Sequence, residues 1–387
     1  MDYRFQTASS VVGGSHSIRR LNELMAALHS PSHVLILTQP SMIRLGHIDT
    51  MTRQLDTMRI AWHVHDRVMR EPTLDSIYDI CDEYSGHSFD ALIGMGGGSV
   101  LDATKLLATL LVERIPPARL LQSGAVCRRG LPMALIPTTS GTGSEVTPNA
   151  IVTLPEEELK VGIISPFFYP DIAILDPVLT LDLPQSITAA TGMDAFTHAL
   201  ESYISNKANP ISDMFALEAI RLISSSLLPA YHHARSLEDR ERVLLGSAYA
   251  GMALSAAGTA AVHALAYPLG GSFNVPHGVA NSMLLTHVMN FNLDAIEDRL
   301  IPVAAAMGYH ERGGDTQSPA AWVLEQITHW TKEMEIPQSL TPFGAKPADL
   351  ERLTAAAAKV TRLLNNNPKP LHTSDIAAIY NKLMPLT

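Results

Sequence analysis

A short apolar run that ends in three consecutive glycines constrains the fold of this chain most. Residues 90–95 are typical of a buried strand, Gly96, Gly97 and Gly98 follow, and a helical stretch then continues to Leu110. Glycines lack a Cβ, so the backbone can turn sharply there and approach a ligand closely. The N-terminus of the following helix offers free N–H groups and partial positive charge to a phosphate. The pattern favours phosphate binding over its alternative, a tight strand-to-helix turn.

Other apolar runs repeat this strand-and-helix alternation through the first half of the chain, which predicts βα units and a mainly parallel sheet. After Leu183 apolar residues recur at helical spacing, and we expect no further strand. The sequence therefore predicts an α/β N-terminal dinucleotide-binding domain over 1–181 and an all-α C-terminal metal-binding domain over 182–387. The expected strands, besides 90–95, are 33–38, 60–64, 133–137 and 171–175, with a hairpin over 151–153 and 160–164.

Composition narrows the class of protein. The chain has 387 residues, 46% of them hydrophobic, and a formal net charge of −10, so it shows no basic footprint for nucleic acid. Its two cysteines, Cys81 and Cys127, form no C-x-x-C pair, and no apolar segment opens the sequence. We therefore expect a cytoplasmic protein with neither a nucleic-acid nor a membrane partner. The apolar stretch 243–267 contains many small residues and is interpreted as two buried helices rather than a membrane span.

A second loop suited to ligand binding follows the predicted strand 133–137. Residues 137–145 read PTTSGTGSE, with five hydroxyl groups and two glycines. Open α/β sheets bind ligands beyond the carboxyl ends of their strands, where this loop and the glycine triplet would meet. An ordinary Ser/Thr-rich loop is an equal reading of this segment alone, but two such loops at one sheet edge reinforce each other.

One carboxylate and three imidazoles in the second half indicate a metal site. Asp194 and His198 are four residues apart, a spacing that points both side chains from one face of a helix. His263 lies in an apolar segment and His277 follows a proline at the start of another. Such a donor set suits Fe²⁺, Zn²⁺ or Co²⁺. Any one of these histidines could instead be a hydrogen-bonded core residue, so the prediction depends on all four together.

Together these motifs resemble the iron-containing (group III) alcohol dehydrogenase family, which has a dehydroquinate-synthase-like fold. The resemblance runs from about Phe5 to the C-terminus. The matching segments are GGGSxxD at 96–102, PTTxGTGSE at 137–145, GMDAxxH at 192–198, HAxAxPLG at 263–270 and PHGVAN at 276–281.

The resemblance implies a nicotinamide cofactor, NAD or NADP, between the domains and a metal, Fe²⁺ or alternatively Zn²⁺, held by the four residues above. It also implies a homodimer or larger homo-oligomer. His277 would further belong to the catalytic centre. The cofactor-binding residues that it implies are Gln39, Glu71, Gly96, Gly97, Gly98, Ser99, Asp102, Thr138, Thr139, Thr142, Thr147, Lys160 and Leu179.

Two positions depart from the family pattern. Many members carry a histidine thought to relay a proton where this chain has Tyr267, and a phenol with a pKa near 10 is a poorer relay at neutral pH. An acid/base role and a packing role for Tyr267 both stay open. Gln39 stands where many members have an aspartate that selects NAD against NADP. Nearby Arg44 would favour the extra phosphate of NADP and Glu71 would disfavour it, so the cofactor choice stays open.

The function that follows is reversible hydride transfer between NAD(P)H and a small alcohol, aldehyde or ketone. The alternatives are a maleylacetate-type reductase, a dehydroquinate-synthase-like lyase and a non-catalytic sensor. A reductase for a dicarboxylate would need paired basic residues. Arg128 and Arg129 form the one basic pair near the predicted loops.

Overall fold

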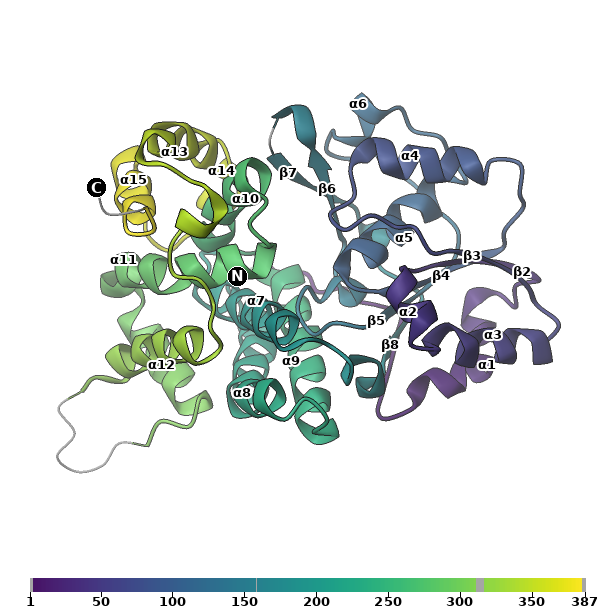
Figure 1. Ribbon diagram of the computed structural model, residues 1–387, viewed down its shortest axis with the longest axis horizontal. Coiled ribbons are helices and arrows are strands. Elements are labelled where there is room, and N and C mark those ends of the chain that lie inside the picture. The colour runs from purple at the N-terminus through teal and green to yellow at the C-terminus, as the bar shows by residue number, and fades with distance from the viewer. Residues whose placement is uncertain (1–2, 158, 311–316, 385–387) are drawn as a thin grey trace.

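The computed structural model of the chain describes residues 3–157, 159–310 and 317–384. Figure 1 shows two parts side by side, an α/β part in purple to teal and a helical part in teal to yellow. All the strands of the described residues lie before Asp176, and the long helices α7 to α12 all lie after it. This confirms the predicted fold class.

A six-stranded sheet forms the centre of the α/β part. Its strand order is β1-β8-β5-β4-β2-β3, and every neighbouring pair is parallel. The carboxyl ends of all six strands therefore lie at one edge. The strands are β1 (Ser10–Gly13), β2 (His33–Leu37), β3 (Ala61–His65), β4 (Ala91–Gly96), β5 (Met133–Pro137) and β8 (Ile172–Leu175).

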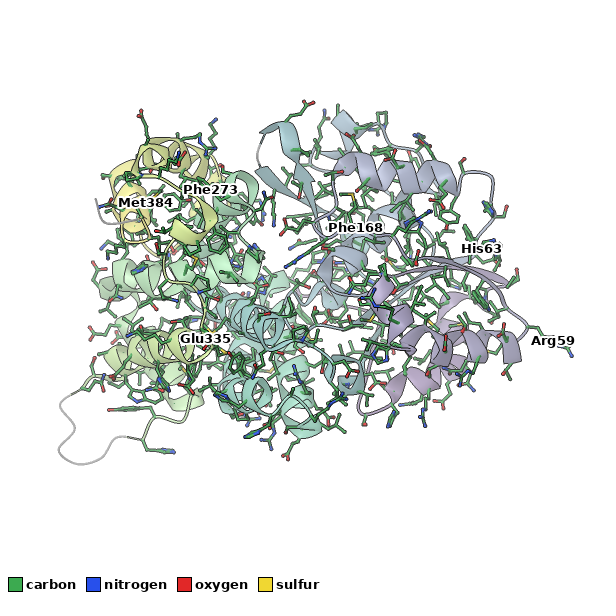
Figure 2. All side chains as sticks on the ribbon, in the orientation of Figure 1. Arg59, His63, Phe168, Phe273, Glu335 and Met384 are labelled. Carbon is green, nitrogen blue, oxygen red and sulfur yellow. The ribbon has the colours of Figure 1, made fainter. Side chains whose placement is uncertain are left out.

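Both faces of this sheet are covered, because the central strands are apolar at every position. Val34 and Ile36 of β2 pack toward the helices α1 to α3, whereas Leu35 and Leu37 pack toward α4 and α5. Phe168, labelled in Figure 2, is fully buried in the cluster on the α4–α5 side. The helices are α1 (Leu21–Leu24), α2 (Pro40–Arg44), α3 (His47–Thr57), α4 (Leu74–Glu83), α5 (Gly98–Leu110) and α6 (Pro117–Leu120).

One strand of this sheet was not expected. β1 has four residues, Ser-Val-Val-Gly, of which every second residue is exposed. A run this short carries too few apolar residues to predict a strand, and its register with β8 comes from the tertiary fold.

The predicted hairpin is present as two antiparallel strands, β6 (Asn149–Leu154) and β7 (Leu159–Ile164). Figure 1 shows it at the boundary between the two parts, where β7 contacts the helix α10 (Ala261–Phe273). The hairpin therefore carries its residues toward the helical part.

The helical part is organised around α7, which packs against α8, α9 and α11. α7 is buried along nearly its whole length, so its polar side chains face other helices rather than solvent. Besides α10, these helices are α7 (Gln185–Ile204), α8 (Pro210–His232), α9 (Leu237–Ala257), α11 (His277–Ala306), α12 (Pro319–Glu333), α13 (Leu350–Ala358), α14 (Thr361–Leu364) and α15 (Thr373–Asn381).

The apolar stretch over 243–267 forms parts of α9 and α10, which are mostly buried. In the described ranges no single helix is long and apolar enough to cross a membrane. The pair α9 and α10 meets that test of length and composition only when taken together, and the two helices meet at 107°.

Candidate active site

The two predicted loops begin side by side at the carboxyl edge of the sheet. Gly96 ends β4 and is in register with Pro137, which ends β5. The Thr138 backbone N–H donates to the Gly96 carbonyl oxygen at 2.9 Å. The glycine triplet and the hydroxyl-rich loop are therefore neighbours, as their strand positions predicted.

The first turn of α5 approaches this second loop very closely. A Cβ added to Gly98 would lie 2.6 Å from Thr142 Cγ2, and one added to Gly97 would lie 3.5 Å from Thr139 Cγ2. Gly97 precedes α5 in extended conformation and has no side chain that could cap the helix. The free N–H groups at the start of α5 thus face an edge formed by backbone and threonine side chains, which suits a phosphate.

Ser99 and the hairpin connect this edge to a charged pair. The Glu71 backbone N–H donates to Ser99 Oγ at 3.1 Å. The Glu71 carboxylate accepts a hydrogen bond from Lys160 Nζ at 2.7 Å, and the lysine side chain is buried. Lys160 also reaches the helical part, since a Cβ added to Gly270 of α10 would lie 3.1 Å from Lys160 Cε.

Three other predicted cofactor residues have interior contacts. Asp102 is buried and accepts hydrogen bonds from Ser144 Oγ at 2.5 Å and from the Ile151 backbone N–H at 3.0 Å. The Thr147 carbonyl accepts a bond from Lys105 Nζ at 3.0 Å. Leu179 lies in the apolar cluster on the α1–α3 side. These contacts support the two loops, and direct cofactor contact stays a prediction for these residues.

Gln39 lies at the end of β2, on the same edge. It is half-buried and precedes α2 in extended conformation, and its side chain makes no capping bond to that helix. The side-chain amide is therefore available to a ligand just before the first residue of α2.

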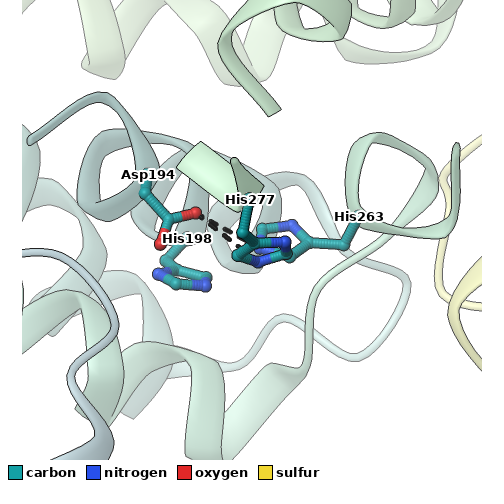
Figure 3. Close-up of side chains that lie close together, drawn as sticks. All are labelled: Asp194, His198, His263 and His277. Atoms are coloured by element: carbon teal, nitrogen blue, oxygen red, sulfur yellow. Dashed lines mark ion pairs between the residues drawn. The ribbon is translucent and has the colours of Figure 1, made fainter. Parts of the chain in front are cut away.

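The four predicted metal ligands come together from three helices. Asp194, His198, His263 and His277 each present one donor atom, and these atoms all lie within 4.8 Å of one another. α7 supplies the first two from one face, α10 supplies His263 in its first turn, and His277 is the first residue of α11. Figure 3 shows the side chains converging, with dashed lines from the Asp194 carboxylate to His263 and His277. Those contacts measure 3.9 and 3.8 Å to the Nε2 atoms.

Hydrogen bonds behind the donors orient two of the imidazoles. His198 Nδ1 lies 3.3 Å from the carbonyl oxygen of Gly141, on the loop after β5. His263 Nδ1 lies 2.6 Å from Glu201 Oε2. Metal-binding histidines characteristically donate their second ring N–H to a carbonyl or carboxylate in this way.

Asn281 contacts three of the four donors. Its Nδ2 donates to Asp194 Oδ1 at 2.7 Å and lies 3.1 Å from His263 Nε2 and 3.3 Å from His277 Nε2. Its Oδ1 is buried and has no hydrogen-bond partner in the described part of the chain. The amide therefore belongs to the same polar cluster, one helical turn after His277.

The donor set fits a divalent transition metal. Burial lowers the pKa of His198 and His277 below the ordinary value for histidine, so both rings are neutral near pH 7, as ligands must be. Asp194 and His198 are buried, whereas the side chain of His277 is 29% exposed. One carboxylate and three imidazoles match iron(II) or zinc(II) and leave His277 on the accessible side.

The α/β loops and the helices meet without intervening side chains. Gly143 has φ of +59°, and a Cβ there would lie 2.7 Å from the Cα of Gly251 on α9. A Cβ on Gly141 would lie 2.7 Å from Thr191 Cβ on α7. Only glycine permits this spacing, so the loop after β5 is held directly against α9 and against α7, which carries two of the four metal-group residues.

Tyr267 lies one turn after His263 on α10, near the exposed side of the group. Its ring centroid is 6.0 Å from that of His277. Burial raises the pKa of its hydroxyl above the ordinary value, with Arg362 opposing the shift. The phenol is therefore protonated at neutral pH in this environment.

Glu201 and Asn281 were not assigned a role from the sequence. A spacing signal exists for Glu201, which follows Asp194 by seven residues and therefore lies on the same face of α7. Asn281 follows His277 by four residues on α11. A helical-face search around the metal ligands would have found both.

The structure does not place the basic pair near the site. Arg129 donates to Asp171, whose other oxygen accepts the Met133 backbone N–H at 2.9 Å, at the amino ends of β5 and β8. Arg128 bonds Glu113 at 2.7 Å. Both arginines are therefore engaged at the edge opposite the glycine loop, which removes the support for a dicarboxylate substrate.

Comparison with known proteins decides the family. Residues 8–177 match the family described as iron-containing alcohol dehydrogenase. Residues 188–384 match the C-terminal region of the Fe-containing alcohol dehydrogenase family. The chain belongs to the iron-containing alcohol dehydrogenase family. It is thus an oxidoreductase of the alcohol dehydrogenase type, in a family that uses iron and NAD(P), which confirms the prediction from its motifs.

Individual relatives agree over nearly the whole chain. Long-chain-alcohol dehydrogenase 1 of Geobacillus thermodenitrificans is 39% identical over 90% of this chain and 88% of its own length. Lactaldehyde reductase of Escherichia coli is 31% identical over 90% of this chain and 91% of its own length. The solved structure of an alcohol dehydrogenase from Oenococcus oeni has a TM-score of 0.93 and 30% identity, covering 99% of this chain and 100% of that one.

Proposed function

We propose that this chain catalyses reversible hydride transfer between NAD(P)H and a small aldehyde or ketone, with iron(II) held by Asp194, His198, His263 and His277. The observation that carries the proposal is a contact between the four metal-group residues and the cofactor edge, by which we mean the loops at the carboxyl ends of β4 and β5. His198 bonds the carbonyl oxygen of Gly141 in the second of these loops. When bound, the cation supplies a Lewis acid that polarises a carbonyl group.

The protein's own residues bind and orient the reactants. The N–H groups at the start of α5, around Gly98 and Ser99, bind the diphosphate, and Thr139 and Thr142 line the same edge. Lys160, paired with Glu71, reaches the ribose. Gly96, Asp102, Thr138, Thr147 and Leu179 act in this proposal mainly as the framework that holds those groups.

Substrate approaches on the side of His277 in this proposal, because the other three donors, which lie on α7 and α10, are buried. The surrounding helices exclude water from the reacting carbon. Tyr267 is adjacent to this approach and forms part of its wall.

The test is oxidation of NADH and, separately, NADPH by aldehydes of increasing chain length and by short ketones. Named activities of relatives range from lactaldehyde reduction to long-chain alcohol oxidation, so the series must cover both ends. We expect turnover by the iron-loaded enzyme without oxygen, and loss of turnover after chelation that added iron reverses. Full turnover by the stripped enzyme would refute the proposed role of the metal.

We further propose a cytoplasmic homodimer or larger homo-oligomer. The two cysteines are unpaired, which supports a reducing compartment. Light scattering coupled to size exclusion measures the assembly, and a monomeric mass at micromolar concentration would contradict it.

A further inference from the structure

A buried carboxylate behind the metal group is not used by the proposed chemistry. Glu201 lies on α7, and its side chain has no exposed surface. Taking a carboxylate out of water is costly unless it is paired and hydrogen-bonded. The contacts of Glu201 therefore explain why an acid is tolerated in this core.

Both oxygens of Glu201 bond to the first turn of α10. Oε2 accepts from His263 Nδ1 at 2.6 Å, and Oε1 accepts from the Val262 backbone N–H at 2.6 Å. The first N–H groups of a helix have no partner within the helix, and negative charge is stabilised there. Glu201 thus holds the end of α10 and the imidazole that α10 carries.

The hydrogen bonds on the other side of the ring decide the tautomer. Asn281 Nδ2 can only donate, and it lies 3.1 Å from His263 Nε2. Nε2 must then accept, so the proton is on Nδ1, where it is donated to Glu201. The ring is held with the lone pair of Nε2 toward Asp194 and His277.

We propose that Glu201 is the positioning residue for the metal centre, acting through His263. The proposal rests on the metal-site assignment of the proposed function. It adds that the affinity of the site for a divalent cation depends on one carboxylate that does not touch the cation. Loss of such an outer partner typically costs about 10–100-fold in metal affinity.

The test compares Glu201→Gln with the matched control Asp171→Asn in the full-length enzyme. Asp171 also accepts one backbone N–H and one side-chain donor, but it lies at the opposite edge of the sheet. The readouts are the dissociation constants for Co²⁺ and Zn²⁺, from chelator competition, and the visible absorption of the Co²⁺-loaded protein. Circular dichroism checks the fold.

We expect Glu201→Gln to bind both cations about 10–100-fold more weakly and to show an altered Co²⁺ spectrum. Asp171→Asn should match the unmodified protein in both, whatever it does to thermal stability. If Glu201→Gln fails to fold, Glu201→Asp keeps the charge with a shorter reach. We expect that variant to fold and to bind Co²⁺ more weakly.

A folded Glu201→Gln protein with unchanged affinity and spectrum would overturn the proposal, as would an equal loss in Asp171→Asn. Metal affinity is measured without substrate, so the outcome is independent of the activity assay. Weaker metal binding in a protein that never oxidises NADH would support the role of Glu201 and count against the proposed reaction.

Discussion

The metal group on α7, α10 and α11 consists of side-chain atoms, whereas the cofactor edge at the start of α5 consists mostly of backbone and small residues. Two of the metal ligands are oriented by a specific partner, His198 by the Gly141 carbonyl and His263 by Glu201. At the cofactor edge the spacing is set by glycines that approach Thr142, Thr191 and α9 closely. One region is therefore sensitive to the loss of a single polar group, and the other to the addition of a single methyl group.

The largest expected effect is the removal of a ligand, Asp194→Ala. The variant loses the only carboxylate among the four grouped donors. We expect kcat/KM for aldehyde reduction to fall by at least about a thousandfold, because Lewis-acid stabilisation is worth several kcal/mol and each 1.4 kcal/mol is tenfold. NADH affinity, measured by fluorescence, should change less than about threefold. An equal loss of NADH affinity would show that the two regions are not separable.

The next largest effect is expected from Gly98→Ala. A Cβ at Gly98 would lie 2.6 Å from Thr142 Cγ2, so α5 and the loop after β5 must move apart. We expect KM for the nicotinamide cofactor to rise by about 10–100-fold, since misplacement by about 1 Å can cost a hundredfold. Metal content, measured by atomic emission, should stay constant.

Gly86→Ala is the matched control, because a Cβ there meets no atom within 4 Å. It should leave cofactor KM and metal content unchanged. Reduced metal content in Gly98→Ala would contradict the separation of the two regions.

Much of the fold and most of the metal site could be predicted from the sequence. The central strands were predicted to within one or two residues because runs such as 91–95 are apolar at every position, the pattern of a strand buried on both faces. The four grouped donors were found because their residue types and the i, i+4 spacing on α7 are informative, and the family motifs located the other two.

The remainder depends on tertiary structure. β1 is too short to predict, and its pairing with β8 joins segments more than 150 residues apart. The sequence places Glu201 on the same helical face as Asp194 but does not show its partners, because Val262 and His263 reach it only when the start of α10 lies beside α7. The position of Arg129 away from the site depends on strand direction, because a residue that precedes a strand lies at the amino edge of the parallel sheet, opposite the glycine loop.

A smaller effect is expected for cofactor choice, tested with Gln39→Asp. The Glu71 carboxylate is already paired with Lys160, which weakens its repulsion of a phosphate and leaves position 39 to decide. A carboxylate there accepts bonds from the ribose hydroxyls and repels the extra phosphate of NADP. We expect the ratio of kcat/KM with NADH to that with NADPH to rise about tenfold or more, since hydrogen bonds to charged groups contribute about 1.5–3 kcal/mol. An unchanged ratio would place cofactor selection elsewhere on the edge.

The smallest effect is expected for Tyr267→Phe, which asks whether the metal region contains a proton relay besides its ligands. The Tyr267 ring lies beside His277, and burial keeps its hydroxyl protonated at neutral pH. A relay must exchange its proton near the working pH, and removing one usually costs 100-fold or more. If the ring only packs, kcat should change less than about threefold and the pH profile of kcat should keep its shape. A hundredfold loss of kcat with unchanged metal content would instead assign the proton transfer to Tyr267, and the metal region would then act through a phenol as well as through its ligands.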